Sequence, residues 1–401
     1  NFSAIQMMRH ENFQYPPLQY KIVELFSPPM TGDEPKEIDI LLQHRSNKIL
    51  KMRLISAIMT LLSALALAFF TRYYFNSNFI SLLSVFFFIT TPISLYYSHT
   101  SNMDQPYLMW WSFSIYSLVL AYFFLKKSQV YYYAILMFFS VVFSALSFCT
   151  KDQVYSLYIL PMILYLFLIY KLKRGFKYIL ITLVSWVLIF TIITGAVYWF
   201  SGGWNTFFTH IKWIINSEHQ ILYSQCQSGI FNRIKFILKS VLDLFQCLDF
   251  PLLVIFLTSI ILLFPSISKY LLKDLVIAQQ ILYKKLFVVL VFFFLTFTSM
   301  QLFFINVTRF SFPRYFLPLL PIVSCSVSVT VYLIQNKFRK IGSIIFTILI
   351  IYQSILSCQF LYGLHNDTRI ILRDFFCKLS KENFMPDIKI ALTGIVNFRK
   401  V

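Results

Sequence analysis

Four polar segments interrupt the apolar stretches of this chain, and they hold the side chains best suited to chemistry. Asp104 is the only carboxylate in the segment that reads Ser-His-x4-Asp-x-Pro. Lys151 lies in Cys-Thr-Lys-Asp-Gln, Arg314 lies in Phe-Pro-Arg-Tyr-Phe-Leu-Pro, and residues 13–18 read Phe-Gln-Tyr-Pro-Pro-Leu. A carboxylate can take up a proton or hold a metal ion, and cations can bind an anionic group. These segments are the candidate site.

Several of these residues also have a purely structural interpretation. Asp104 comes shortly before a proline and could cap a helix, because Asp is favoured at N-caps and Pro in first turns. Arg53 stands at the start of the first apolar stretch, where an Arg side chain can extend its charged end to the membrane interface. His219 follows Glu218 in a long polar segment, where a lone His can simply be solvated. Both interpretations stay open for each residue.

The composition is that of a membrane protein. Hydrophobic residues make up 58% of the 401 positions and charged residues 13%, at a mean hydropathy of +0.70. A soluble domain carries roughly 25% charged residues, so this chain lacks the polar surface that water requires. The net charge of +19 fits the Lys and Arg that accumulate in cytoplasmic loops of membrane proteins. We therefore expect an integral, multi-pass membrane protein with no nucleic-acid partner.

Apolar stretches recur along the chain at about 20 residues each, the length that crosses ~30 Å of hydrocarbon. They predict an all-α, polytopic membrane helix bundle of about ten spans. Amphipathic helices near 17–26 and 206–245 should lie on the outer membrane face. The predicted spans are residues 54–74, 79–97, 107–125, 130–148, 154–170, 178–200, 251–265, 286–305, 316–334 and 341–362.

The distribution of charge orients this bundle. One alternating set of loops between spans holds 14 Lys and Arg, and the short loops of the opposite set hold three. The first set is therefore cytoplasmic. The chain then divides into a first outer loop (1–53), a transmembrane domain (54–362) with a large outer loop (201–250), and the start of an outer C-terminal region (363–401). Fifteen of the 16 Asp and Glu and all six His lie outside, which predicts a site at the outer membrane face.

The motifs resemble those of the GT-C membrane glycosyltransferases. The branch in question comprises the protein O-mannosyltransferases and the bacterial lipid A aminoarabinose transferases. Members carry a Pro-Pro-Leu-x-Tyr-type motif in the first outer loop, an Arg at the start of the next span, a Ser-His…Asp-x-Pro loop, a Thr-Lys-Gly/Asp loop and a Pro-Arg-Tyr-Leu-Leu-Pro motif. This chain has counterparts in the same order across residues 13–321. The resemblance implies a GT-C type fold.

The same resemblance implies transfer of a sugar from a polyprenyl- or dolichyl-phosphate donor to an acceptor that the sequence does not identify. It assigns catalysis, and a possible divalent metal, to Asp104 and His219. It assigns the donor phosphate to Arg314, Lys151 and Arg53, and the first-loop motif to Gln14, Tyr15, Pro16 and Pro17. The enzyme would act in a bacterial inner membrane or in the endoplasmic reticulum.

Two departures from the family pattern leave alternatives open. Family members often place an acidic residue and a Lys before the two prolines, where this chain has Gln14 and Tyr15. Their principal catalytic Asp lies farther upstream, so we expect its counterpart, and one more span, before Asn1. A non-catalytic GT-C-like membrane subunit is therefore one alternative. The other is a polyisoprenoid-lipid flippase or transporter, which would need internal pseudo-symmetry and polar residues at the membrane midplane.

Overall fold

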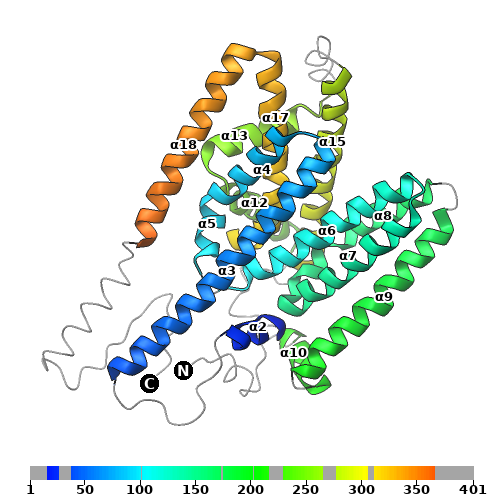
Figure 1. Ribbon diagram of the computed structural model, residues 1–401, viewed down its shortest axis with the longest axis vertical. Coiled ribbons are helices and arrows are strands. Elements are labelled where there is room, and N and C mark those ends of the chain that lie inside the picture. Colours follow the sequence, from blue (N-terminus) through cyan, green and yellow to red (C-terminus); the bar gives the residue numbers. More distant parts are fainter. Residues whose placement is uncertain are drawn as a thin grey trace, which may run out of the picture.

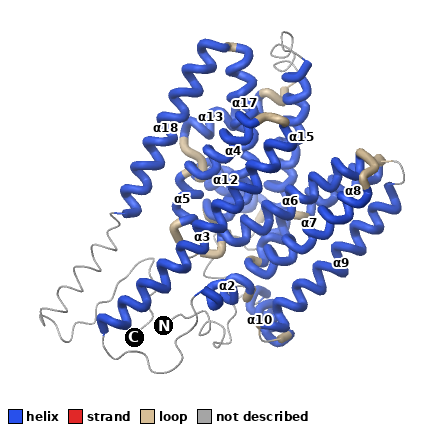
Figure 2. Tube along the Cα trace, in the orientation of Figure 1, coloured by secondary structure: helices blue, strands red, loops and turns tan. Residues whose placement is uncertain are grey.

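The computed structural model describes residues 16–26, 38–100, 102–172, 175–201, 203–215, 229–264, 277–305 and 311–365. Every regular element in these ranges is a helix, which confirms the predicted all-α bundle (Figure 2). The elements before the large outer loop are α2 (Leu18–Phe26), α3 (Ile38–Phe75), α4 (Asn78–Thr90), α5 (Pro92–Ser98), α6 (Asp104–Lys126), α7 (Val130–Thr150), η1 (Asp152–Leu157), α8 (Ile159–Tyr170) and α9 (Gly175–Phe200). Those within or after that loop are α10 (Trp204–Ile215), α12 (Ile230–Gln246), α13 (Phe250–Ile261), α15 (Ile277–Met300), η2 (Gln301–Ile305), η3 (Pro313–Leu319), α17 (Leu320–Lys337) and α18 (Arg339–His365).

Eight helical segments of the described chain are long and apolar enough to cross a membrane. They coincide with eight of the ten predicted spans. The other two predicted spans correspond to bent helix pairs, α4 with α5 at 67° and α12 with α13 at 119°. Residues 251–265 were expected to be one span, but α13 has only 12 residues, which is short of the roughly 20 that a span needs.

Burial separates the central helices from those at the periphery. The segment that comprises η3 and α17 is 89% buried in its most apolar window, whereas the span in α9 is 11% buried and that in α18 is 17% buried. Figure 1 shows α17 within the bundle, α9 along one edge and α18 along the other. Helix α17 carries Ser324, Ser326 and Ser328, whose small side chains allow neighbouring backbones to approach closely.

Helices α6 and α7 form an antiparallel hairpin that positions the candidate site. Its seam carries reciprocal hydrogen bonds: Ser114 Oγ donates to the Ser140 carbonyl at 2.7 Å, and Ser140 Oγ donates to the Ser114 carbonyl at 2.9 Å. Farther along, Ser147 Oγ donates to the Tyr107 carbonyl at 2.9 Å. Because the seam fixes the register of the two helices, the beginning of α6 lies beside the end of α7.

The predicted amphipathic helices are present as α2, α10 and α12. On α12, the apolar residues Ile230, Ile234, Leu238 and Leu242 recur every four positions and are exposed. The opposite side of α12 buries Phe236, Ser240, Asp243 and Leu244 against the bundle. An exposed apolar stripe of this kind suits a helix that lies along the membrane interface.

Candidate active site

Asp104 and Lys151 meet at the end of the bundle that the charge count places outside. Asp104 is the first residue of α6, and Lys151 follows the last residue of α7 in extended backbone. The Lys151 ammonium donates a hydrogen bond to Asp104 Oδ1, and the two side chains are 3% and 0% exposed. Asp104 Oδ2 is buried and has no hydrogen-bond partner among the described residues. A buried ion pair with one unused acceptor is an uncommon arrangement, because buried polar atoms are normally paired.

The helix-cap interpretation of Asp104 is wrong. Met103 is the N-cap of α6, and no side chain caps this helix. The Asp104 carboxylate sits in the first turn, where the helix dipole favours negative charge, but its partner is Lys151. Two consecutive antiparallel helices of similar length place these two residues at the same end. The hairpin pattern in the sequence could therefore have predicted their contact.

Aromatic rings surround the Lys151 ammonium. Lys151 Nζ lies 5.1 Å from the centroid of the Tyr107 ring and 5.5 Å from that of Tyr315. Tyr107 belongs to the first turn of α6, and Tyr315 belongs to the 3-10 helix η3. Sequence reasoning assigned neither tyrosine a role. Tyr107 was recognisable, because it follows Asp104 by three residues and so shares its helix face.

Arg314 brings a second cation to this end of the bundle. Its guanidinium carbon lies 5.6 Å from the centroid of the Tyr315 ring and 5.4 Å from that of Phe312. Tyr315 thus contacts both Lys151 and Arg314, so the structure brings these two cations to the same ring. Prolines at 313 and 318 restrict the backbone of η3.

The electrostatics of this cluster are dominated by burial. Burial lowers the pKa of Lys151 below its usual 10.5, the neighbouring Arg314 cation lowers it further, and Asp104 opposes both by favouring the charged form. Desolvation penalises a charge wherever it is buried. A charged Lys151 therefore depends on the groups that touch it.

The remaining predicted residues do not join this cluster in the described chain. Pro16 and Pro17 are buried at the start of α2. Arg53 is exposed on α3, which begins earlier than the predicted span, at Ile38. Gln14, Tyr15 and His219 lie outside the described residues. Within the described ranges no three His, Cys, Asp or Glu side chains are grouped to hold a metal, so the metal stays a prediction.

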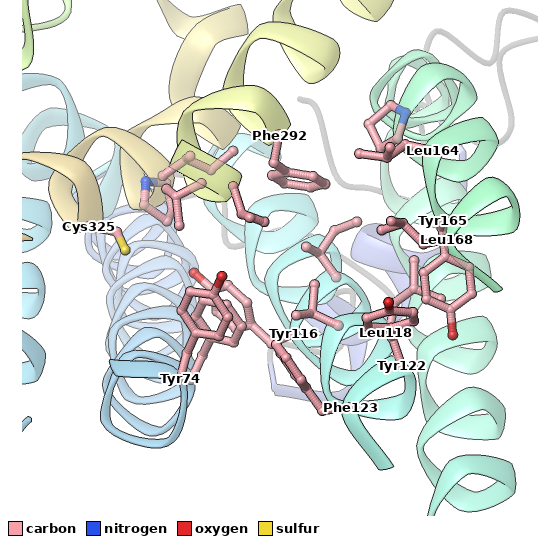
Figure 3. Close-up of a pocket in the computed structure, with 18 of the residues that line it drawn as sticks. Tyr74, Tyr116, Leu118, Tyr122, Phe123, Leu164, Tyr165, Leu168, Phe292 and Cys325 are labelled. Carbon is pink, nitrogen blue, oxygen red and sulfur yellow. The ribbon is translucent and has the colours of Figure 1, made fainter. Parts of the chain in front are cut away.

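An apolar cavity of about 330 Å³ lies deeper in the bundle, between α3, α6, α8, α15 and α17 (Figure 3). Its closest residue on α6 is Trp111, seven positions after Asp104, or ~10 Å along the helix. The cavity continues to Lys126 at the other end of α6. Figure 3 shows Tyr74 and Tyr116 on one side and Tyr122 and Tyr165 on the other. Val288 of α15 also lines it and is itself 52% exposed.

Comparisons with known proteins agree with this architecture. Residues 38–199, from the start of α3 to near the end of α9, match the family model described as dolichyl-phosphate-mannose-protein mannosyltransferase. No curated protein matches the chain in sequence. The matched range contains Asp104 and Lys151.

Two solved structures of ArnT from Cupriavidus metallidurans align with this chain, and the one bound to undecaprenyl phosphate shows the similarity in fold. The one bound to undecaprenyl phosphate has a TM-score of 0.50 at 14% identity and covers 82% of this chain and 54% of its own. The apo structure has a TM-score of 0.45 at 15% identity and covers 82% and 53%. This chain thus spans about half the length of those proteins. The predicted family resemblance is confirmed: the chain is an integral, multi-pass membrane protein of the GT-C fold, similar to the protein O-mannosyltransferases and the ArnT-type transferases.

Proposed function

We propose that this chain is a membrane glycosyltransferase that uses a polyprenyl-phosphate sugar donor. The observation that carries this proposal is the arrangement of three features, two along α6 and one on the neighbouring η3. A buried carboxylate with an unused oxygen stands at the outer end, Arg314 lies nearby, and an apolar cavity begins ~10 Å deeper. A lipid-phosphate sugar has a matching order of parts: the sugar would lie at the carboxylate, the phosphate at Arg314, and the lipid tail in the cavity. ArnT, which shares the fold, was solved with undecaprenyl phosphate.

We assign the donor phosphate to Arg314 ahead of Lys151. The Lys151 ammonium is buried and already paired with Asp104, so it is less accessible to a phosphate than Arg314 is. Arg314 is only half-buried and presents a planar, multi-donor guanidinium, a geometry that suits phosphate oxygens. Arg53, which is exposed on α3, stays a predicted phosphate ligand of lower priority.

Asp104 would act on the acceptor. Its Oδ1 is held by Lys151, which leaves Oδ2 to accept a proton from an acceptor hydroxyl. The hydroxyl oxygen then bonds to the anomeric carbon of the sugar, and the bond from that carbon to the phosphate oxygen breaks. Polyprenyl phosphate leaves with the bonding electrons, and Arg314 stabilises its negative charge. A divalent metal held by Asp104 and His219 is the alternative way to activate the hydroxyl.

The cavity would hold part of the lipid tail of the donor. Its walls are the apolar and aromatic side chains of five helices, and its volume of about 330 Å³ suits a segment of a branched hydrocarbon chain. Burial of such a chain is favourable at roughly 25 cal/mol per Å² of apolar surface. The tail would then anchor the donor while its phosphate reaches the Asp104 end of α6.

The test is sugar release by the purified protein in lipid nanodiscs. Dolichyl-phosphate mannose and undecaprenyl-phosphate aminoarabinose are supplied in turn, with water as the acceptor hydroxyl, and free polyprenyl phosphate is measured over time. We expect release from one donor and a fall of about 10²-fold or more for Asp104→Asn, as for the loss of a positioned base. Asp243→Asn is the matched control, since Asp243 is also a buried carboxylate but lies on α12. Equal rates for wild type and Asp104→Asn would contradict the assignment, and chelator treatment would reveal a metal.

A further inference from the structure

The Lys151 ammonium has more contacts than an ion pair supplies. It carries three N–H donors, and one of them is used by Asp104 Oδ1. Tyr107 and Tyr315 lie within the ~6 Å over which an aromatic face attracts a cation, and they are 1% and 9% exposed. A buried ammonium has lost its water. The two rings therefore replace part of its hydration shell.

Tyr107 is held firmly in this position. It follows Asp104 by three residues, so its side chain lies on the same face of α6. Its backbone carbonyl accepts the hydrogen bond from Ser147 Oγ of α7 at 2.9 Å. The first turn of α6 thus offers Lys151 both a carboxylate and a ring, and the α6–α7 seam fixes the height of that turn against the end of α7, from which Lys151 extends.

Tyr315 brings a second ring to the ammonium from a separate part of the chain. It lies in η3, whose prolines stiffen the backbone, and it also packs on Phe304 with ring centroids 5.2 Å apart. We call the Tyr107 and Tyr315 rings the aromatic cage. Asp104, Arg314 and Asp152 are the charged groups that act on the caged ammonium.

We propose that Tyr107 is a positioning residue of this site: with Tyr315 it cages the charged Lys151 ammonium, which in turn holds Asp104 with Oδ2 free for a substrate hydroxyl. The last clause rests on the proposed function, and the cage itself does not. Without the Tyr107 ring, the buried ammonium loses stabilisation, and the Asp104 carboxylate loses a fixed partner. A tyrosine that only fills space in the core would be indifferent to the charge beside it.

A double-mutant cycle separates these two roles without any activity assay. Tyr107→Leu and Tyr107→Phe are made in the wild type and in the Lys151→Met background, and thermal unfolding is measured in detergent. The cage predicts that Tyr107→Leu lowers the midpoint clearly in the wild type and much less once the cation is gone. Tyr107→Phe keeps the ring but loses the hydroxyl that bonds Gln153, so any loss it causes should be the same in both backgrounds. Equal losses from Tyr107→Leu in both backgrounds would show a packing role and overturn the proposal.

The functional arm uses undecaprenyl phosphate as the binding probe and donor turnover as the second readout. Tyr107→Leu should lower kcat by about tenfold or more, the size that a desolvated cation–π contact carries, while the Kd for undecaprenyl phosphate changes little. Tyr107→Phe should restore turnover. A rise in Kd with unchanged kcat would place Tyr107 in donor binding and refute the positioning role. If the wild type transfers no sugar, the proposed function fails, and the unfolding cycle still decides whether the cage exists.

Discussion

Helix α6 contributes to two regions of opposite character. At its outer end, Asp104 and Lys151 are both charged and almost wholly buried. Farther along, the same helix lines an apolar cavity and ends at Lys126, which is exposed. Burying Lys151 costs free energy that Lys126 does not pay, because its charge remains in solvent at a helix C-terminus that favours it. The free-energy cost of burying charge thus falls at the Asp104 end of α6 and not at the Lys126 end. The Asp104 end is therefore the better candidate for chemistry.

Breaking the ion pair should have the largest effect. Lys151→Met leaves the Asp104 carboxylate buried without a cation and should lower the free energy of unfolding by ~3–5 kcal/mol. Asp104→Asn should also destabilise the protein, by leaving the Lys151 cation unpaired. The double variant Asp104→Asn/Lys151→Met removes both charges and should be more stable than either single variant. Denaturant unfolding in detergent measures all three. A double variant no better than the singles would mean that the pair is not an isolated electrostatic unit.

Removing the second cation should affect binding more than stability. Arg314→Ala should weaken undecaprenyl phosphate by about 10- to 100-fold, since a hydrogen bond to a charged group contributes roughly 1.5–3 kcal/mol. The matched control is Arg233→Ala, because Arg233 is an exposed cation on α12. Equilibrium binding to the purified protein is the measurement. If both variants bind equally well, the phosphate is held elsewhere, and Arg53 becomes the next candidate.

Filling the cavity should discriminate between donor tails. Val289 lines the cavity and is 8% exposed, so Val289→Phe should reduce the affinity for undecaprenyl phosphate by about tenfold, or ~1.4 kcal/mol. Geranyl phosphate has the same head and a short tail, and its affinity should not change. Val187→Phe on α9 is the control, because Val187 is 65% exposed. Equal losses for both ligands would argue that the tail does not enter the cavity.

The smallest expected effect is on the alkaline side of the stability profile. Burial lowers the pKa of Lys151 below its usual 10.5. At a pH between the lowered pKa of the folded state and the usual pKa of the unfolded state, the unfolded chain holds a proton that the folded chain has released. Rising pH therefore stabilises the fold in that range. The thermal midpoint of the wild type relative to Lys151→Met should therefore increase as the pH approaches 10.5. A difference that is flat or that falls with pH would mean that Lys151 stays fully protonated when folded.

The helical fold was largely predictable because hydrophobic length is a local property. Eight predicted spans coincide with helical segments that are long and apolar enough to cross a membrane without being joined to a second helix across a bend. The bend between α4 and α5 falls at Pro92, and the 119° bend between α12 and α13 falls just before the N-cap Asp249 and Pro251 of α13, so both breaks have a local signal in the sequence. The long α3 was missed, since its start at Ile38 precedes the apolar stretch.

The site was predictable in part. Charge counting placed Asp104, Lys151 and Arg314 on one side of the membrane, and the structure brings them into one cluster around Tyr315. Helix geometry along the α6–α7 hairpin would have paired the first two. The approach of Tyr315 depends on long-range packing of η3 against α6, which no local pattern encodes. The roles of His219, Gln14 and Tyr15 stay predictions.

The cavity also bears on how a ligand would arrive. Val288 belongs to its wall and is itself half-exposed on α15, so we expect the entrance to open sideways, into the hydrocarbon. A lipid would enter by diffusing in two dimensions through the leaflet. Its effective concentration is then a mole fraction of the surrounding lipids. Saturation curves for this protein should therefore collapse onto one another when plotted against donor per lipid, whatever the total volume of the sample.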